Sequence, residues 1–186
     1  MRRALYIAAA VFLAMTLIGI ELEKARVRRQ EEARLEMEKA KLAGERAQVA
    51  LSSTELIYAA IQEYSAKYRN GFPSQLKVMG RPEWGKPTNC NAAGLIQLDL
   101  ANGAQEGYMF QYVPGAPVGK PASGCASSGV RSFALLIRPA TYVGRVSYSF
   151  FVDETGIIRV TPENRAPNAS DPTVAEQIRK ELDRRP

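Results

Sequence analysis

The chain has 186 residues, no histidine, two cysteines and a formal net charge of +6 at neutral pH. Without histidine it lacks the usual general base, the usual zinc ligand and the group that activates serine or cysteine nucleophiles, which excludes most hydrolase mechanisms. Lysine and arginine alternate with glutamate through most of the chain, so a nucleic-acid partner is not expected, and neither a metal nor a cofactor is indicated.

The N-terminal end is typical of a membrane anchor. Met1, Arg2 and Arg3 precede an uncharged apolar run at residues 4–20. As a helix this run would span about 26 Å at ~1.5 Å per residue, enough to cross the hydrocarbon of a bilayer. A cleaved secretory signal is the alternative, but no small-x-small site follows and the run is long for a signal sequence. We therefore predict a retained anchor at residues 1–20 that contacts lipid.

Cys90 and Cys125 decide the predicted orientation of this anchor. Both lie in loop sequence rich in glycine, proline, asparagine and serine, where a single disulfide is their natural use. Basic residues flank the apolar run on both sides and give no clear direction by themselves. A bacterial disulfide needs the oxidising side of the membrane. We expect a single-pass protein of the bacterial inner membrane, with a cytoplasmic N-terminus and a periplasmic C-terminal domain.

A long helix is predicted from residue 21 to about Tyr68, where no proline interrupts a sequence rich in helix formers. Residues 21–50 carry opposite charges three residues apart, such as Glu36 and Lys39, which indicates a solvated helical stalk. A coiled coil is the alternative, although the heptad positions do not form an apolar seam. Further on, apolar residues recur at steps of four and three and predict a face covered by a sheet: Ala50, Thr54, Ile57, Ile61, Tyr64 and Tyr68.

Two signals predict where this helix bends and ends. Ser52 to Glu55 resemble a capping box, so we expect a bend or a restart near Ser52. Gly71 suits a left-handed C-cap, and Pro73 cannot continue a helix.

The remainder of residues 51–161 predicts a small antiparallel sheet. Strand patterns occupy residues 107–113, 132–138, 146–152 and 157–161, and the short connections between them favour a meander. Residues 91–103 suit either a short helix or an extended segment, with helix preferred for its alanine and leucine. The fold class is therefore α+β, with a long helix packed on a small antiparallel sheet.

An acidic turn between the last two strands raises the question of a catalytic carboxylate. Asp153, Thr155 and Gly156 resemble an aspartic-protease loop, but Glu154 separates Asp153 from Thr155 and no second copy exists to supply the partner carboxylate. We interpret the segment as a structural turn closed by a left-handed glycine.

Trp84 is the candidate binding anchor, in the loop sequence RPEWGKP at residues 81–87. Tryptophan contributes large binding energies where it is displayed to a peptide or a glycan. The competing interpretation, which we favour at this point, is an aromatic side chain folded over the core. Tyr108 and Tyr142 are further candidates for such a surface.

The C-terminal end, residues 162–186, predicts a polar linker followed by a short helix. Val174, Ile178 and Leu182 fall on one helical face, and acidic residues among the basic ones favour a solvated helix over one that binds lipid or nucleic acid.

The order of these parts resembles type IV pilins and the pseudopilins of type II secretion. The likeness lies in LSSTELIYAAIQEYSAKYRNGFPSQLKVMG (51–80), AGLIQLDLANGAQEGYMFQYVPG (93–115) and VSYSFFVDETGIIRVT (146–161). The resemblance implies a pilin-like domain at 51–161, with other pilin-like or secretion-system subunits as partners.

One departure from that family concerns processing. Prepilins place the glycine cleavage site before the apolar span, whereas here Gly19 and Glu21 stand after it. Cutting after Gly19 would remove the anchor, so we expect a permanently anchored pilin-like protein.

The leading hypothesis is thus a membrane-anchored, non-enzymatic envelope protein that makes protein contacts in a pilus or secretion-type assembly. The alternative is an anchored periplasmic or surface binding module for a peptide or glycan, with Trp84 as its anchor. The sequence does not address homo-oligomerisation.

Overall fold

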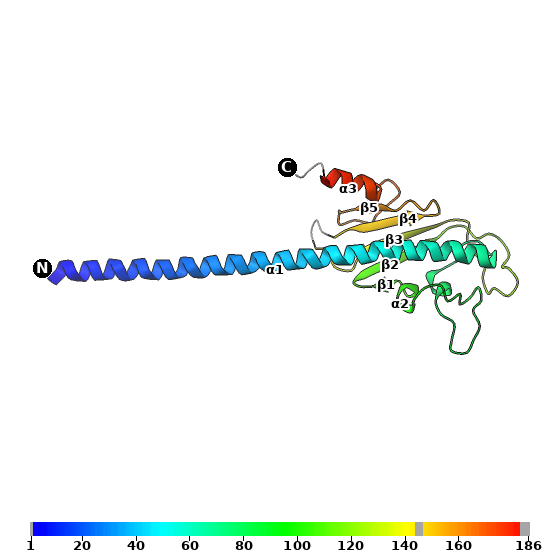
Figure 1. The fold of residues 1–186 in the computed structure, drawn as a ribbon, viewed down its shortest axis with the longest axis horizontal. Coiled ribbons are helices and arrows are strands. Elements are labelled where there is room, and N and C mark those ends of the chain that lie inside the picture. The colour runs from blue at the N-terminus through cyan, green and yellow to red at the C-terminus, as the bar shows by residue number, and fades with distance from the viewer. Residues whose placement is uncertain (1, 144–146, 183–186) are drawn as a thin grey trace. The chain divides into compact units, whose positions relative to one another are not determined.

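Figure 1 shows the computed structural model, which describes residues 2–143 and 147–182, with side chains described at 22–143 and 147–178. The chain forms two compact units, Met1–Leu42, here called the N-terminal unit, and Ala43–Pro186, here called the head. The fold is α+β, as predicted. Its elements in chain order are α1 (Arg2–Tyr68), η1 (Leu76–Met79), α2 (Leu98–Ala101), β1 (Ala104–Gln105), β2 (Tyr108–Pro114), β3 (Phe133–Pro139), β4 (Ser149–Asp153), β5 (Arg159–Thr161) and α3 (Val174–Leu182).

Helix α1 carries its charges on an exposed surface in the N-terminal unit. From residue 22 to residue 42 every side chain is exposed except those of Ala25 and Ala40, which are half-buried. The predicted pair forms, with Lys39 Nζ 2.9 Å from Glu36 Oε1. The described residues contain no helix long and apolar enough to cross a membrane, and the predicted span at 4–20 lies outside the residues whose side chains are described.

Within the head, α1 buries one side. The predicted stripe is buried from Ala50 through Thr54, Ile57 and Ile61 to Tyr64, whereas Tyr68 is half-buried. The buried face also begins earlier than predicted, at Ala43 and Ala47. Small residues at the start of the stripe and larger ones further on form one continuous apolar side that joins the hydrophobic core.

The helix does not restart near Ser52, because α1 is continuous through this segment. Its hydroxyl groups have other partners: Thr54 Oγ1 donates to the Ala50 carbonyl oxygen at 2.7 Å, and Ser53 Oγ donates to Gln105 Oε1. A hydroxyl that bonds back to the preceding turn is compatible with an uninterrupted helix. The first left-handed residue after the helix is Arg69, at φ 49°, and the expected Gly71 is left-handed as well, at φ 78°.

The five strands form one antiparallel sheet in the order β1-β2-β3-β4-β5, which confirms the predicted meander. Side chains that face each other across paired strands share a face of the sheet. The pairings Phe110 with Ile137, Ile137 with Phe150 and Phe150 with Val160 therefore make one apolar row across four strands. All four side chains are buried in the same core as the α1 stripe.

The strands that the sequence pattern predicts are all present, some of them shorter than expected. Strands β4 and β5 begin three and two residues later than their patterns suggested. The segment at 91–103 contains the short helix α2, and the two-residue strand β1 was not predicted. Two residues are too few to show the alternation of apolar and polar side chains that identifies a strand.

Asp153, Thr155 and Gly156 form the turn between β4 and β5. The backbone N–H of Thr155 donates to Asp153 Oδ1 at 3.0 Å, and the N–H of Gly156 donates to the Asp153 carbonyl oxygen at 3.0 Å. Gly156 has φ +76°, and a Cβ placed on it would lie 2.6 Å from Tyr58 Oη of α1. The Asp153 carboxylate therefore fixes the turn, and the turn lets the backbone approach the helix closely.

We expect Gly156→Ala to lower the free energy of unfolding by roughly 1–3 kcal/mol, because it combines a left-handed backbone with a collision against Tyr58. Urea unfolding followed by circular dichroism measures the change. Gly44→Ala is the matched control: Gly44 is helical with no atom within 4 Å of its added Cβ. That variant should be neutral or gain up to about 1 kcal/mol. An unchanged midpoint for Gly156→Ala would show that the turn does not need its glycine.

Candidate functional site

A disulfide joins the two long loops of the head. Cys90 and Cys125 are bonded, with their Cα atoms 5.5 Å apart, as the sequence led us to expect. Tyr64 of α1 donates its hydroxyl to the Cys90 carbonyl oxygen at 2.7 Å. The bridge is therefore fixed to the buried face of the helix as well as to both loops.

Asn70 makes a second connection between the same loops, which the sequence did not reveal. This buried side chain donates from Nδ2 to the Ser127 carbonyl oxygen at 3.0 Å and accepts from the Ala122 N–H at 2.9 Å. Nearby, Phe72 and Val130 exchange two backbone hydrogen bonds of 2.9 Å. A buried amide with both ends satisfied positions a loop without the help of a regular element.

Trp84 lies on a tight turn within the first of these loops. The N–H of Lys86 donates to the Glu83 carbonyl oxygen at 3.0 Å, and Gly85 has φ +78°, which is the arrangement of a type II turn. The Lys86 ammonium group is 2.6 Å from the Glu83 carboxylate. The Trp84 side chain is 100% exposed. The interpretation of Trp84 as an aromatic folded over the core is therefore wrong, because nothing in the head covers it.

The base of this loop is anchored on both sides of the turn. Gly94 donates its N–H to the Gly80 carbonyl oxygen at 2.9 Å, and Asn89 and Ala92 exchange backbone hydrogen bonds of 3.2 and 3.1 Å. With the disulfide at Cys90, these bonds connect the Trp84 turn to the core through short, defined backbone. The side chain is thus presented by an ordered loop.

Positive charge gathers in the two loops and in the short elements next to them. Residues 67–91 and 115–131, here called the cationic loop end, contain one acidic residue, Glu83, and seven exposed basic ones: Lys67, Arg69, Lys77, Arg81, Lys86, Lys120 and Arg131. Their net charge of +6 equals the formal net charge of the whole chain. The rest of the sequence is therefore balanced, and a partner that meets this end meets a positive surface.

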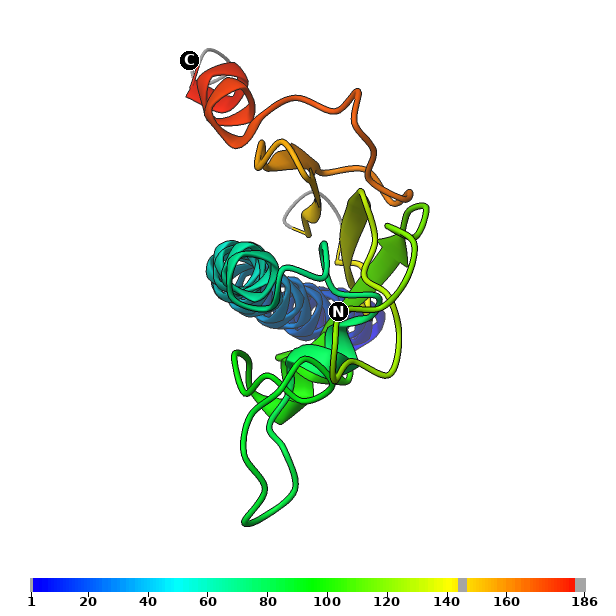
Figure 2. The ribbon, with the colours of Figure 1, turned by 90° about the vertical axis from the view of Figure 1, so that its right-hand side faces the viewer.

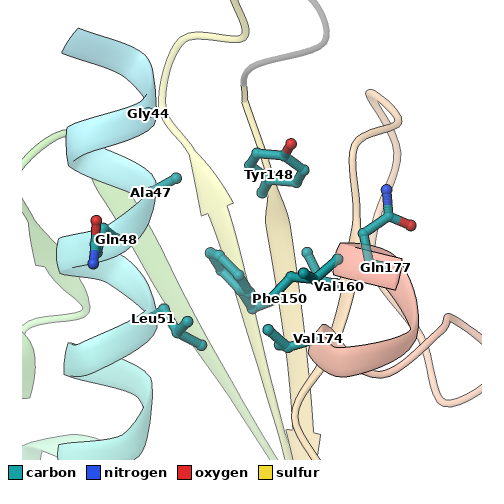
Figure 3. A pocket seen from close by; sticks show the side chains of 10 residues that line it. Gly44, Ala47, Gln48, Leu51, Tyr148, Phe150, Val160, Val174 and Gln177 are labelled. Atoms are coloured by element: carbon teal, nitrogen blue, oxygen red, sulfur yellow. The ribbon is translucent and has the colours of Figure 1, made fainter. Parts of the chain in front are cut away.

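An apolar groove of about 250 Å³ lies elsewhere in the head, between α1 and α3 over the last two strands. Figure 3 shows Ala47 and Leu51 of α1 pointing toward Phe150, with Val174 of α3 on the other side. Val160 lies beside Phe150 on the floor of the groove. The apolar row of the sheet thus continues from the core into a surface depression.

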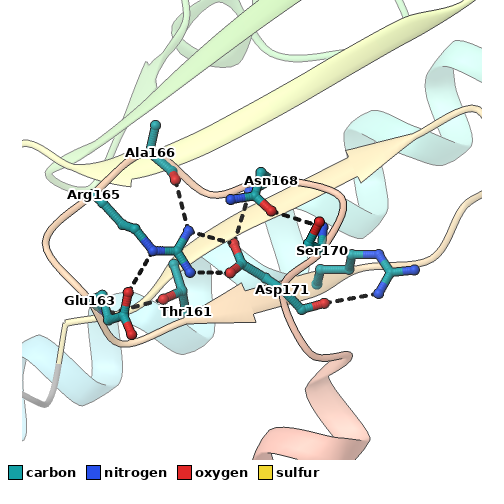
Figure 4. Close-up of polar contacts among 8 residues, drawn as sticks. Thr161, Glu163, Arg165, Ala166, Asn168, Ser170 and Asp171 are labelled. Carbon is teal, nitrogen blue, oxygen red and sulfur yellow. Dashed lines mark hydrogen bonds and ion pairs between the residues drawn. The ribbon is translucent and has the colours of Figure 1, made fainter.

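The position of α3 depends on a polar cluster in the segment that precedes it (Figure 4). Arg165 donates from Nη1 to Asp171 Oδ2 at 3.1 Å and from Nη2 to Asp171 Oδ1, and the side chain of Asp171 is only 3% exposed. The Asn168 N–H donates to Asp171 Oδ2 at 2.8 Å. Arg159 of β5 donates to the Asp171 carbonyl oxygen at 2.9 Å. The segment predicted as a linker therefore has a defined structure around one carboxylate.

Backbone bonds continue this connection into α3. The N–H of Val160 donates to the Pro172 carbonyl oxygen at 2.9 Å, and that of Val174 donates to the Ile158 carbonyl oxygen at 3.3 Å. At the start of α3, Thr173 and Glu176 bond reciprocally as a capping box, with distances of 2.7 and 3.3 Å. The tail is thus attached along the edge of β5.

Burial and hydrogen bonding act in opposite directions on the pKa of Asp171. Burial alone would raise it, but the hydrogen bonds from Arg165 and from the Asn168 N–H favour the ionised form and bring the pKa below its ordinary value. The carboxylate is therefore charged throughout the neutral range.

The remaining predicted residues lie apart from this cluster and from Trp84. Tyr108 is buried, donating its hydroxyl to the Tyr148 carbonyl oxygen at 3.0 Å, so it is not a surface anchor. The turn at Asp153 faces Tyr58 of α1 and does not belong to the cationic loop end. Within the described part of the chain, no group of three or more histidine, cysteine or acidic residues could hold a metal ion.

The chain matches no protein-family model, no curated protein and no solved structure. Inferences about its function therefore rest on its own residues and their arrangement.

Asp171→Asn should lower the free energy of unfolding by about 1–2 kcal/mol at neutral pH, because it removes a buried charge that Arg165 and a backbone N–H stabilise. Arg165 is partly exposed and can regain water, which limits the loss. Since the folded pKa is depressed, this stability is present above the unfolded pKa of about 3.9 and is lost as the pH falls through the folded value. Urea unfolding of both proteins at neutral and acidic pH should show the difference shrinking below about pH 4.

Glu163→Gln, at an exposed partner of Arg165, is the control and should change stability by under about 0.5 kcal/mol. A difference that stays constant down to low pH would contradict the role of the ionised carboxylate.

Proposed function

We propose that this chain is a single-pass, pilin-like envelope protein without enzymatic activity, whose head lies outside the cytoplasm and whose N-terminal unit makes contacts with partner proteins. The observation that carries the proposal is a row of large apolar side chains on the exposed surface of α1. We call this row the outer row: Val27, Leu35 and Leu42, with exposed fractions of 54, 52 and 46%.

The outer row has the geometry of a helix-binding face. Val27 and Leu35 are eight residues apart and Leu35 and Leu42 seven, so at 3.6 residues per turn all three project from one side of the helix. Three of the five large apolar side chains exposed between residues 22 and 42 thus share one side, whereas Leu22 and Met37 lie on other sides. Exposed apolar residues that gather on one side indicate a protein contact. The charges around them are mixed in sign, as on the flanks of helices that pair. A partner helix would complete the apolar seam that the heptad pattern of this chain leaves incomplete.

The compartment is supported by the disulfide. A bond between Cys90 and Cys125 is stable where thiols are oxidised, which in bacteria is outside the cytoplasmic membrane. Residues 4–20 are our proposed anchor, with Arg2 and Arg3 on the cytoplasmic side. This topology places the head, and the part of α1 that follows the anchor, in the periplasm.

The proposed partners are subunits of a pilus or of a type II secretion-type assembly. A long helix packed along one face of a small antiparallel meander, with disulfide-tied loops beyond the sheet, is in keeping with the resemblance to pilins and pseudopilins. Gly19 and Glu21 follow the proposed anchor at residues 4–20, so a cut after Gly19 would separate the head from that anchor. We therefore propose that the chain joins such an assembly as an anchored component.

A second candidate function is a surface binding module, and the exposure of Trp84 favours it. A fully exposed tryptophan on an anchored turn exposes more apolar surface to water than a solvated loop requires. The two functions use different parts of the chain and are compatible with each other.

Photo-crosslinking in the native host tests the protein contact. A benzoylphenylalanine at Leu35 should give an adduct of higher mass, because this position would lie within the partner interface. The same group at Arg29, which is exposed on the opposite side of α1, is the matched control. Equal adducts at both positions, or none at either, would contradict the outer row as the contact surface.

A C-terminal alkaline phosphatase fusion tests the topology. The fusion should be active, because the enzyme requires disulfides that form only outside the cytoplasm. A cytoplasmic reporter at the same position should be inactive. The reverse pattern would place the head in the cytoplasm and contradict the proposed periplasmic location.

A further inference from the structure

The Trp84 turn projects from the head as a convex tip. Residues 83–89 are all exposed, and Figure 2 shows this part of the chain, in green at the lower edge, extending away from the helices and the sheet. A side chain in a cleft loses part of its exposed surface to the walls, whereas Trp84 keeps all of it. The turn therefore suits a partner that can deform around it.

The charged residues beside the tip indicate the charge of that partner. Arg81 and Lys86 stand on either side of Trp84 in the sequence. The other basic residues of the cationic loop end are Lys67 in the last turn of α1, Lys77 in η1, and Arg69, Lys120 and Arg131 in the irregular segments. Glu83 is the one acidic residue among them and pairs with Lys86. An anionic surface is the electrostatic complement of this end.

We infer that the Trp84 turn docks on an anionic bilayer surface, with the indole in the interfacial region and the surrounding basic residues at the lipid head groups. The inference rests on the second candidate function and names its ligand class. Tryptophan prefers the boundary between water and hydrocarbon, because its ring is apolar and its N–H remains in contact with polar groups. Each lysine or arginine near an anionic leaflet adds to the attraction.

Geometry favours this ligand over a peptide or a glycan. A peptide groove or a sugar site surrounds its ligand with several walls, whereas the Trp84 turn offers one aromatic residue at a tip. A bilayer needs no such walls, because its interface deforms around the inserted ring. The ordered base of the loop, closed by the disulfide at Cys90, keeps the ring in position for insertion.

The chain provides its own reporter, because Trp84 is its single tryptophan. The full chain is held in nanodiscs of phosphatidylcholine and mixed with vesicles that contain phosphatidylglycerol or with vesicles of phosphatidylcholine alone. With the anionic vesicles the emission of Trp84 should shift to shorter wavelength, and brominated lipids in those vesicles should quench it. Added salt should reverse both effects, because it screens the exposed charges.

Co-flotation with the same vesicles measures the contribution of single residues. Arg81→Gln should weaken binding about fivefold, the factor that corresponds to ~1 kcal/mol per basic residue at an anionic surface. Trp84→Ala should weaken it at least as much. The matched controls are Arg46→Gln, an exposed cation of α1, and Met109→Ala, an exposed apolar residue of β2; both should bind as the unmodified chain does.

Three results would overturn the inference. These are an unchanged Trp84 emission with anionic vesicles, an equal shift with neutral ones, and full binding by Trp84→Ala. Poly-glutamate that shifts the emission when anionic vesicles do not would assign the surface to an acidic protein instead. Such a failure is distinguishable from a failure of the proposed function, because neither the topology fusion nor the cross-link at Leu35 depends on Trp84.

Discussion

Ile57 and Ile61 of α1 are fully buried in the same core as the apolar row of the sheet, and the rest of the head is arranged around this layer. A small sheet is stable when a helix covers its apolar face, because the strands alone would leave that face exposed to water. The helix also positions the parts that are not regular. Tyr64 holds the disulfide loop through the Cys90 carbonyl group, and Tyr58 lies directly against the turn at Gly156.

Two polar residues extend this order beyond the apolar layer. Asn70 connects the loops at one end of the head, and Asp171 fixes the tail that carries α3. Both are buried, and both are satisfied by several hydrogen bonds, which is the condition under which a buried polar group stabilises a fold. Because the two clusters share no residues, the surface around Trp84 and the groove beside α3 are supported separately.

Periodic features of the sequence predicted much of this fold. The stripe from Ala50 to Tyr64 and the alternation within β2 and β3 are repeated signals, and the structure places them where their periods indicate. Features that depend on single long-range partners were not visible. Nothing in the residues around Asn70 shows which distant carbonyl group it will meet. The partners of Asp171 are nearer, at Arg165 and Asn168, but they lie in irregular sequence that has no period to reveal them. The apparent capping box near Ser52 starts no helix, because α1 continues through it. For Trp84 the loop sequence was recognised, but whether the ring would pack on the core depends on the loop's path and not on local propensity.

The attachment of the tail along β5 has a consequence for how this protein can assemble. An edge strand with free backbone groups is a template on which another chain can add a strand. Here Val160 already donates its N–H to Pro172, and the Ile158 carbonyl oxygen already accepts from Val174. The chain thereby occupies this edge of its own sheet, and a neighbour cannot extend the sheet there without first displacing the tail. At this edge, association therefore depends on contacts between side chains and not on the addition of a strand.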